Sequence, residues 1–131
     1  MKQGEHLFQF SGADIAKAAR AEFDYHTIRQ AFWETEQGKI VEQARSLTAT
    51  IKIREQQVTG GKRYEIVADI TGAQDLNWRL GIAATKIEHH RQLADEFWLK
   101  AIAYETQPDR HYELDPQDVA YFRLNGGKRE E

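Results

Sequence analysis

Five histidines are the residues best suited to bind a metal ion or transfer protons near neutral pH: His6, His26, His89, His90 and His111. His89 and His90 are neighbours, so on a helix their side chains point about 100° apart and do not easily share one ion. Neither has a histidine or carboxylate three or four residues away, as helical metal ligands do. Glu22 and His26 have that spacing, but one such pair indicates little. We therefore expect no metal and no cofactor, with His90 on a packed helix face and His89 facing solvent.

Motifs for nucleophilic catalysis or nucleotide binding are not recognisable in the sequence. The chain has no cysteine, which excludes a thiolate nucleophile and a Cys-ligated metal centre. Its two serines, Ser11 and Ser46, have no G-x-S-x-G setting. The segment Gly60-Gly61-Lys62-Arg63 is not a phosphate-binding loop, because such a loop needs glycine at Gln56 and Ser or Thr at Arg63. We expect a protein that is not an enzyme.

Phosphate binding by lysine and arginine is the remaining chemistry that residue types suggest. Residues 52–64 carry four cations and one acid, Glu55, in a chain of formal net charge −3. The candidate nucleic-acid-binding residues are Lys52, Arg54, Lys62, Arg63 and Tyr64, with Arg29 upstream. The alternative is that these cations have no ligand and only keep an exposed strand edge in contact with water.

Two runs of alternating apolar and polar residues, 47–54 and 64–70, predict the β-hairpin that carries these cations. With Gly60 and Gly61 as the turn, the predicted pairs are Ile51 with Ile70, Lys52 with Asp69, Ile53 with Ala68, and Gln57 with Tyr64. One mismatch remains, Glu55 opposite Ile66. We interpret it as the point where the hairpin projects from the protein body.

A long amphipathic helix is predicted from about Thr71, its N-cap, to Glu105. Its apolar residues recur every three or four positions, as on a helix face that must be buried. This stripe comprises Leu76, Leu80, Ala83, Ile87, His90, Ala94, Phe97, Ala101 and Tyr104, with Trp98 and Ile102 beside its C-terminal end. At Gly81 three alternatives are open: the helix kinks there, begins after it, or is continuous over about 45 Å. Its length suggests a partner helix, from the same chain or from another.

The segment before the hairpin is also expected to be helical. A first helix is predicted from Gly12 to about Phe23, after which the chain either breaks near Asp24 or continues through Trp33. Gly38 is the next expected stop, and residues 40–47 predict a further helical face. Helices followed by a basic hairpin have the element order of a winged-helix DNA-binding protein, with the long helix as a dimerisation element.

The ends of the domain carry local signals of their own. Ser11 and the segment Asp115-Pro116-Gln117-Asp118 are expected helix starts, the second for a short C-terminal docking helix. Residues 7–10 and 111–114 are predicted to be short extended segments. The small and charged residues 126–131 are predicted to be a mobile tail.

The fold class expected from these patterns is α+β, in one domain at residues 1–125. It comprises N-terminal helices, a two-stranded antiparallel hairpin, one long amphipathic helix and a short C-terminal helix. With 131 residues, 40% apolar and 30% charged, the chain can bury a modest core. It lacks a membrane-spanning apolar run and a signal-peptide pattern. We therefore expect a cytoplasmic protein with no membrane partner.

For function, these patterns favour a non-enzymatic protein-binding or assembly protein that acts as a homodimer through the long helix and the projecting hairpin. The predicted partner-binding residues are Ile87, His90, Phe97, Trp98 and Tyr104. The alternative is nucleic-acid binding by the basic hairpin. Exposed Trp98 and Phe97 would favour a protein partner, whereas a basic face joining Arg29 to the hairpin would favour nucleic acid.

Overall fold

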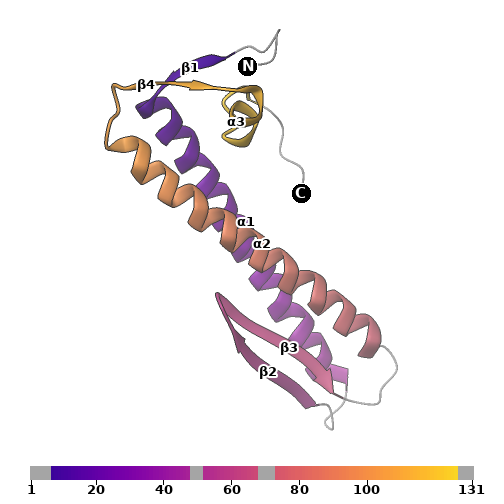
Figure 1. Ribbon diagram of the computed structural model, residues 1–131. Helices are drawn as coiled ribbons and strands as arrows, with labels where there is room; N and C mark the ends of the chain where they lie inside the picture. The colour runs from indigo at the N-terminus through magenta and orange to yellow at the C-terminus, as the bar shows by residue number, and fades with distance from the viewer. Residues whose placement is uncertain (1–6, 48–51, 68–72, 127–131) are drawn as a thin grey trace. The chain divides into compact units, whose positions relative to one another are not determined.

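A computed structural model describes residues 7–47, 52–67 and 73–126, and it confirms the predicted α+β class. Figure 1 shows two long helices, a hairpin and a short C-terminal helix. The elements in chain order are β1 (Phe8–Ser11), α1 (Gly12–Leu47), β2 (Lys52–Val58), β3 (Gly61–Val67), α2 (Ala73–Glu105), β4 (His111–Leu114) and α3 (Pro116–Tyr121).

Contacts group the chain into two compact units, each of which takes part of α1 and part of α2. The β1–β4 unit consists of residues 1–25 and 93–131, and the hairpin unit consists of residues 26–92. The single domain at residues 1–125 stays a prediction. The predicted tail, apart from Gly126, lies outside the described residues.

Helix α1 is one continuous helix of 36 residues, where the sequence predicted several. Of the two alternatives at Asp24, the helix continues through Trp33 and does not break, whereas the predicted stop at Gly38 is wrong. A glycine inside a helix costs only about 1 kcal/mol relative to alanine, and burial of Ile40, Val41 and Ala44 just beyond Gly38 outweighs that cost. Because residues 12–47 contain no turn, they do not form the two helices that a winged helix requires.

The long helix predicted from Thr71 is α2, which begins at Ala73 and ends at Glu105. Thr71, the predicted cap, lies outside the described residues, and the helix continues through Gly81 without interruption. The predicted stripe is confirmed, because its residues from Leu76 to Ala101 are buried and Tyr104 is partly buried. In both units the residues that cover it include side chains of α1, so a helix of the same chain is its partner.

Replacing Gly81 with alanine is expected to stabilise the protein by about 0.5–1 kcal/mol, because glycine inside a helix carries an entropic cost. Apart from the neighbouring residues and the backbone of its own helix, a Cβ at this position would have no atom within 4 Å, so the gain is not offset by a clash. Urea denaturation followed by circular dichroism measures the change. Gly38→Ala is the matched control, since its Cβ position in α1 is equally open and should give a similar gain. A loss of stability in both variants would contradict this reading of the two sites.

In the β1–β4 unit, β1 and β4 form an antiparallel two-stranded sheet in which Phe8 lies opposite Leu114 and Ser11 opposite His111. The sequence predicted both extended segments but not their pairing. Below the sheet lies a core of Ile15, Ala19, Phe97, Ala101, Leu114, Val119 and Phe122. The Phe97 ring stacks on Tyr121, with 4.7 Å between ring centroids.

Both predicted helix starts in this unit are confirmed by side-chain caps. The Ser11 hydroxyl oxygen accepts a hydrogen bond from the backbone N–H of Asp14 at 3.1 Å. The Asp115 carboxylate accepts one from the backbone N–H of Asp118 at 2.8 Å, with Pro116 as the first helical residue. These bonds satisfy N–H groups that have no partner inside the helix.

In the hairpin unit, β2 and β3 form the predicted hairpin, but its register is shifted. Val58 pairs with Gly61, so the turn is Thr59-Gly60 and not Gly60-Gly61. The observed pairs are Lys52 with Val67, Ile53 with Ile66, Arg54 with Glu65, Glu55 with Tyr64, and Gln57 with Lys62. Four predicted partners, Ile51, Ala68, Asp69 and Ile70, lie outside the described residues.

Packing around Ile66 explains the observed register. The shift moves each partner by two residues, which keeps every side chain on its face of the hairpin. Ile66 is buried in a cluster with Ile40 and Leu80, and Ile53 packs against that cluster from the opposite strand. The predicted mismatch of Glu55 with Ile66 does not occur, so our reason for a projecting hairpin at that point was wrong.

Two side-chain amides hold the hairpin to the helices of its unit. The Asn77 carbonyl oxygen accepts from the Ile66 N–H at 2.7 Å, and the Asn77 amide nitrogen donates to the Ile66 carbonyl at 3.0 Å. From α1, the Gln37 amide donates to the Lys62 carbonyl at 2.9 Å. The hairpin is thus anchored through β3, while residues 54–60 are exposed.

Candidate functional site

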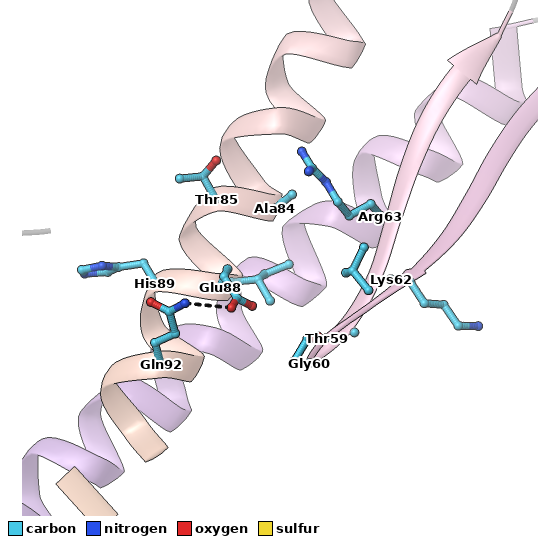
Figure 2. A pocket seen from close by; sticks show the side chains of 12 residues that line it. Thr59, Gly60, Lys62, Arg63, Ala84, Thr85, Glu88, His89 and Gln92 are labelled. Carbon is cyan, nitrogen blue, oxygen red and sulfur yellow. Dashed lines mark hydrogen bonds between the residues drawn. The ribbon is translucent and has the colours of Figure 1, made fainter. Parts of the chain in front are cut away.

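The hairpin turn and α2 enclose an open cleft of about 530 Å³ in the hairpin unit. Residues 58–63 line one side and α2 residues between Ala84 and Gln92 line the other. Figure 2 shows Arg63 extending toward α2, whereas Lys62 points away from it. The cleft has the volume of a small-molecule site, but it is open along the hairpin.

The acidic group of this cleft already has partners. Glu88 accepts hydrogen bonds from Arg91 Nη2 at 2.5 Å, from Arg91 Nε at 3.0 Å and from Gln92 Nε2 at 3.0 Å. The hydrogen bond from Arg91 lowers the pKa of the Glu88 carboxyl. Arg91 also packs on the turn, since a Cβ at Gly60 would lie 2.0 Å from Arg91 Cδ. Glu88 therefore holds a neighbouring arginine in place and is poorly suited to act as a general acid.

Ion pairs neutralise two of the predicted nucleic-acid-binding cations. Arg54 Nη1 lies 3.4 Å from Glu65 Oε2, and Lys62 Nζ lies 2.8 Å from Glu55 Oε1. The hydrogen bond to Glu55 raises the pKa of the Lys62 ammonium group. Both pairs bring opposite charges together on the hairpin surface, which weakens the positive potential around Arg54 and Lys62.

The other residues of this predicted set occupy different places. Lys52 begins β2, Arg63 lies on β3 beside the cleft, and Tyr64 is partly buried against the core of the hairpin unit. Arg29 lies on α1 with its guanidinium 4.5 Å from the centre of the Phe32 ring. Gln37, the α1 residue that contacts the hairpin, follows Arg29 by eight residues. This separation is about 12 Å along the helix axis.

A buried histidine pair lies between α1 and α2 of the hairpin unit. His26 Nδ1 and His90 Nδ1 are 2.8 Å apart, and the two residues are 8% and 2% exposed. His90 on a packed face and His89 on the surface are both confirmed. Sequence reasoning missed the partnership of His26 because no periodicity relates positions so far apart in the chain.

No metal site emerges from the histidines that the structure describes. Within residues 7–47, 52–67 and 73–126, no group of three or more His, Cys, Asp or Glu side chains could hold a metal ion. His111 lies on β4, exposed at the surface, and His6 is outside the described residues.

Three of the five predicted partner-binding residues lie inside the chain. Ile87, His90 and Phe97 are 7%, 2% and 3% exposed. They are covered because the chain supplies its own second helix, so a partner that meets this form of the protein cannot contact them. Tyr104 is partly buried, with its ring 5.0 Å from that of Tyr112. Trp98 is the exposed member of the set.

Trp98 belongs to an exposed apolar surface of α2, which we call the α2 patch and define as Trp98, Leu99 and Ile102. Their exposed fractions are 40%, 67% and 42%. The sequence pattern pointed to Trp98 and Ile102 but missed Leu99. The sequence feature that could have identified Leu99 is that it is an apolar residue of the helix outside the buried stripe.

The border of the α2 patch is aromatic and charged. The Phe23 ring centroid is 5.0 Å from that of Trp98, and the Arg20 guanidinium lies 5.3 Å from the Trp98 ring centre. Arg20 Nη2 also donates to Glu105 Oε2 at 2.7 Å. Apolar residues bordered by paired charges resemble the core and rim of a protein interface.

Elsewhere in the β1–β4 unit, the ionisable side chains of Tyr121 and Glu96 form a structural contact. The Tyr121 hydroxyl donates a hydrogen bond to the Glu96 carboxylate. Burial raises the pKa of the Tyr121 hydroxyl well above its usual value, and the bond to Glu96 raises it further. Tyr121 therefore stays neutral and acts as a donor that ties α3 to α2.

Comparison of the chain with protein-family models, curated proteins and solved structures finds no match. Among the residues that the structure describes, no helix is long and apolar enough to cross a membrane.

Proposed function

We propose that this chain is a non-enzymatic protein-binding or assembly protein that forms a homodimer through α2, with the hairpin as a second contact. The supporting observation is the α2 patch, in which Leu99 is 67% exposed beside Trp98 and Ile102. Tryptophan is enriched among residues that dominate binding energy. Clustered exposed apolar side chains, unlike scattered ones, mark interaction sites.

The charge around the patch favours a second copy of the chain as the partner. In a twofold dimer the same patch faces itself, so a border of one charge sign would repel its copy. Arg20 and Glu105 on this border are already paired with each other. Two such borders can approach without like-charge repulsion, while the apolar centres bury each other.

The double substitution Leu99→Glu, Ile102→Glu is expected to weaken self-association at least about tenfold, the effect of losing one strong interface contact. Glutamate keeps helix propensity and both positions are exposed, so folding should be preserved. Sedimentation equilibrium over a wide concentration range measures the dimer dissociation constant.

Ile28→Glu is the matched control for this experiment. Ile28 is 68% exposed on α1, close to the 67% of Leu99, and lies outside the patch. The control should dimerise as the wild type does. A wild-type chain that stays monomeric at every concentration would overturn the homodimer, and equal weakening by Ile28→Glu would remove the patch from the interface.

Nucleic-acid binding is the alternative function, and the position of Arg63 favours it. Arg63 borders the cleft with Lys62, and neither the Arg54 nor the Lys62 ion pair involves it. The two ion pairs count against it, since phosphate contacts need available charge. Salt-sensitive binding of oligonucleotides that is lost in a Lys62→Glu, Arg63→Glu variant would discriminate this alternative.

A further inference from the structure

The buried pair of His26 and His90 has a geometry that limits how many protons it can hold. A hydrogen bond between two Nδ1 atoms at 2.8 Å needs one nitrogen to donate and the other to accept. The pair can be neutral, or it can carry one extra proton at an Nε2 atom. With two extra protons both Nδ1 atoms carry hydrogen, and two N–H groups of like charge face each other.

On α2, an imidazole and a guanidinium group adjoin the pair. His89 is the nearest imidazole, with its ring centroid 6.4 Å from that of His26 and 5.0 Å from that of His90. Arg91 follows His90 directly and is a cation, bound to Glu88.

On α1, charged residues lie about one turn to either side of His26. Glu22 precedes it by four residues, is 2% exposed and forms an ion pair with Arg123 at 3.3 Å. Arg29 follows it by three residues, with its guanidinium over the Phe32 ring. Arg29 is a cation within one turn of His26 on the same helix, so it opposes a second positive charge on the pair.

We infer that the His26–His90 pair is a pH-sensitive switch that holds at most one shared proton, so that a second proton separates α1 from α2 in the hairpin unit. The unfolded chain binds one proton on each of these histidines below about pH 6.5. The folded unit binds fewer, so its stability is complete above that pH and falls as the pH decreases. When the unfolded state binds one proton more than the folded state, each decrease of one pH unit raises the unfolding equilibrium constant by up to about tenfold.

The test compares urea unfolding of the wild type and of His90→Gln between about pH 7.5 and 5.5, above the range in which ordinary carboxylates titrate. Glutamine can still accept a hydrogen bond from His26 but cannot take a proton. From about pH 6.5 to 5.5 we expect the unfolding constant of the wild type to rise about fivefold more than that of the variant, because a histidine with a pKa near 6.5 is already half protonated at the start of this interval. An equal rise in both proteins would overturn the inference.

His89→Gln is the matched control, because it removes the adjacent exposed imidazole from the same helix. It should keep the wild-type pH dependence, and a loss equal to that of His90→Gln would overturn the role of the buried pair. If His90→Gln does not fold, nitrogen-15 NMR of the wild-type imidazoles replaces it. Both rings becoming cationic in a folded chain would refute the switch, whereas double protonation only with loss of tertiary chemical-shift dispersion would support it.

Discussion

Phe97→Ala is expected to lower the free energy of unfolding by about 3–5 kcal/mol, the usual cost of removing a buried phenylalanine. The Phe97 side chain is 3% exposed and contacts the rings of Tyr121 and Phe122, with centroid distances of 4.7 and 6.2 Å. Both partners come from the C-terminal segment, so the cavity would also weaken its docking. Urea denaturation followed by far-UV circular dichroism measures the loss.

Leu99→Ala provides the control for this substitution. Leu99 lies two residues further along α2 and is 67% exposed, so at a protein concentration that keeps the chain monomeric its truncation should change the stability by no more than about 0.5 kcal/mol. Similar losses of stability in the two variants would show that α2 does not bury the face that carries Phe97.

Gly12→Ala is the second substitution with a large expected effect, a loss of about 1–3 kcal/mol from overpacking. A Cβ at Gly12 would lie 2.3 Å from the Gln107 carbonyl oxygen and 2.8 Å from that of Tyr104. These are backbone atoms, so no side-chain rotation relieves the clash. The start of α1 would have to move and strain the hydrogen bond from the Gly12 N–H to the Arg110 carbonyl, now 2.8 Å.

The contrast with Gly81→Ala isolates the cause of this loss. The same chemical change in open surroundings should stabilise the protein, whereas at Gly12 it should destabilise it. Thermal unfolding of both variants under one set of conditions gives the two signs directly. A neutral or stabilising Gly12→Ala would mean that the helix start and the segment after α2 are not in close contact.

The features that were predicted correctly from the sequence depend on residues that lie close together along the chain. The buried face of α2 follows from a spacing of three and four residues, and the Ser11 and Asp115 caps follow from the chemistry of single turns. The same local evidence misled us about α1, because tertiary burial beyond Gly38 overrides a weak helix breaker. It also placed the hairpin turn one residue too late, since two adjacent glycines fit either position.

The features that could not be predicted join distant parts of the chain. The partnership of His26 with His90 and the pairing of β1 with β4 have no periodic signature in one sequence. The burial of Ile87 and Phe97 was foreseen as a packed face, but the sequence left open whether the covering helix was internal. For the candidate site, local pattern indicated Trp98, and only the exposure of Leu99 completed the patch.

The division of the chain into two units has a consequence for how it is made. The hairpin unit is one continuous stretch, residues 26–92, whereas the β1–β4 unit joins residues 1–25 to residues 93–131. Closing so long a loop costs more chain entropy than closing a short one. During synthesis on the ribosome, the hairpin unit can therefore assemble first. Phe8 must wait for Leu114 to emerge before β1 finds its strand partner.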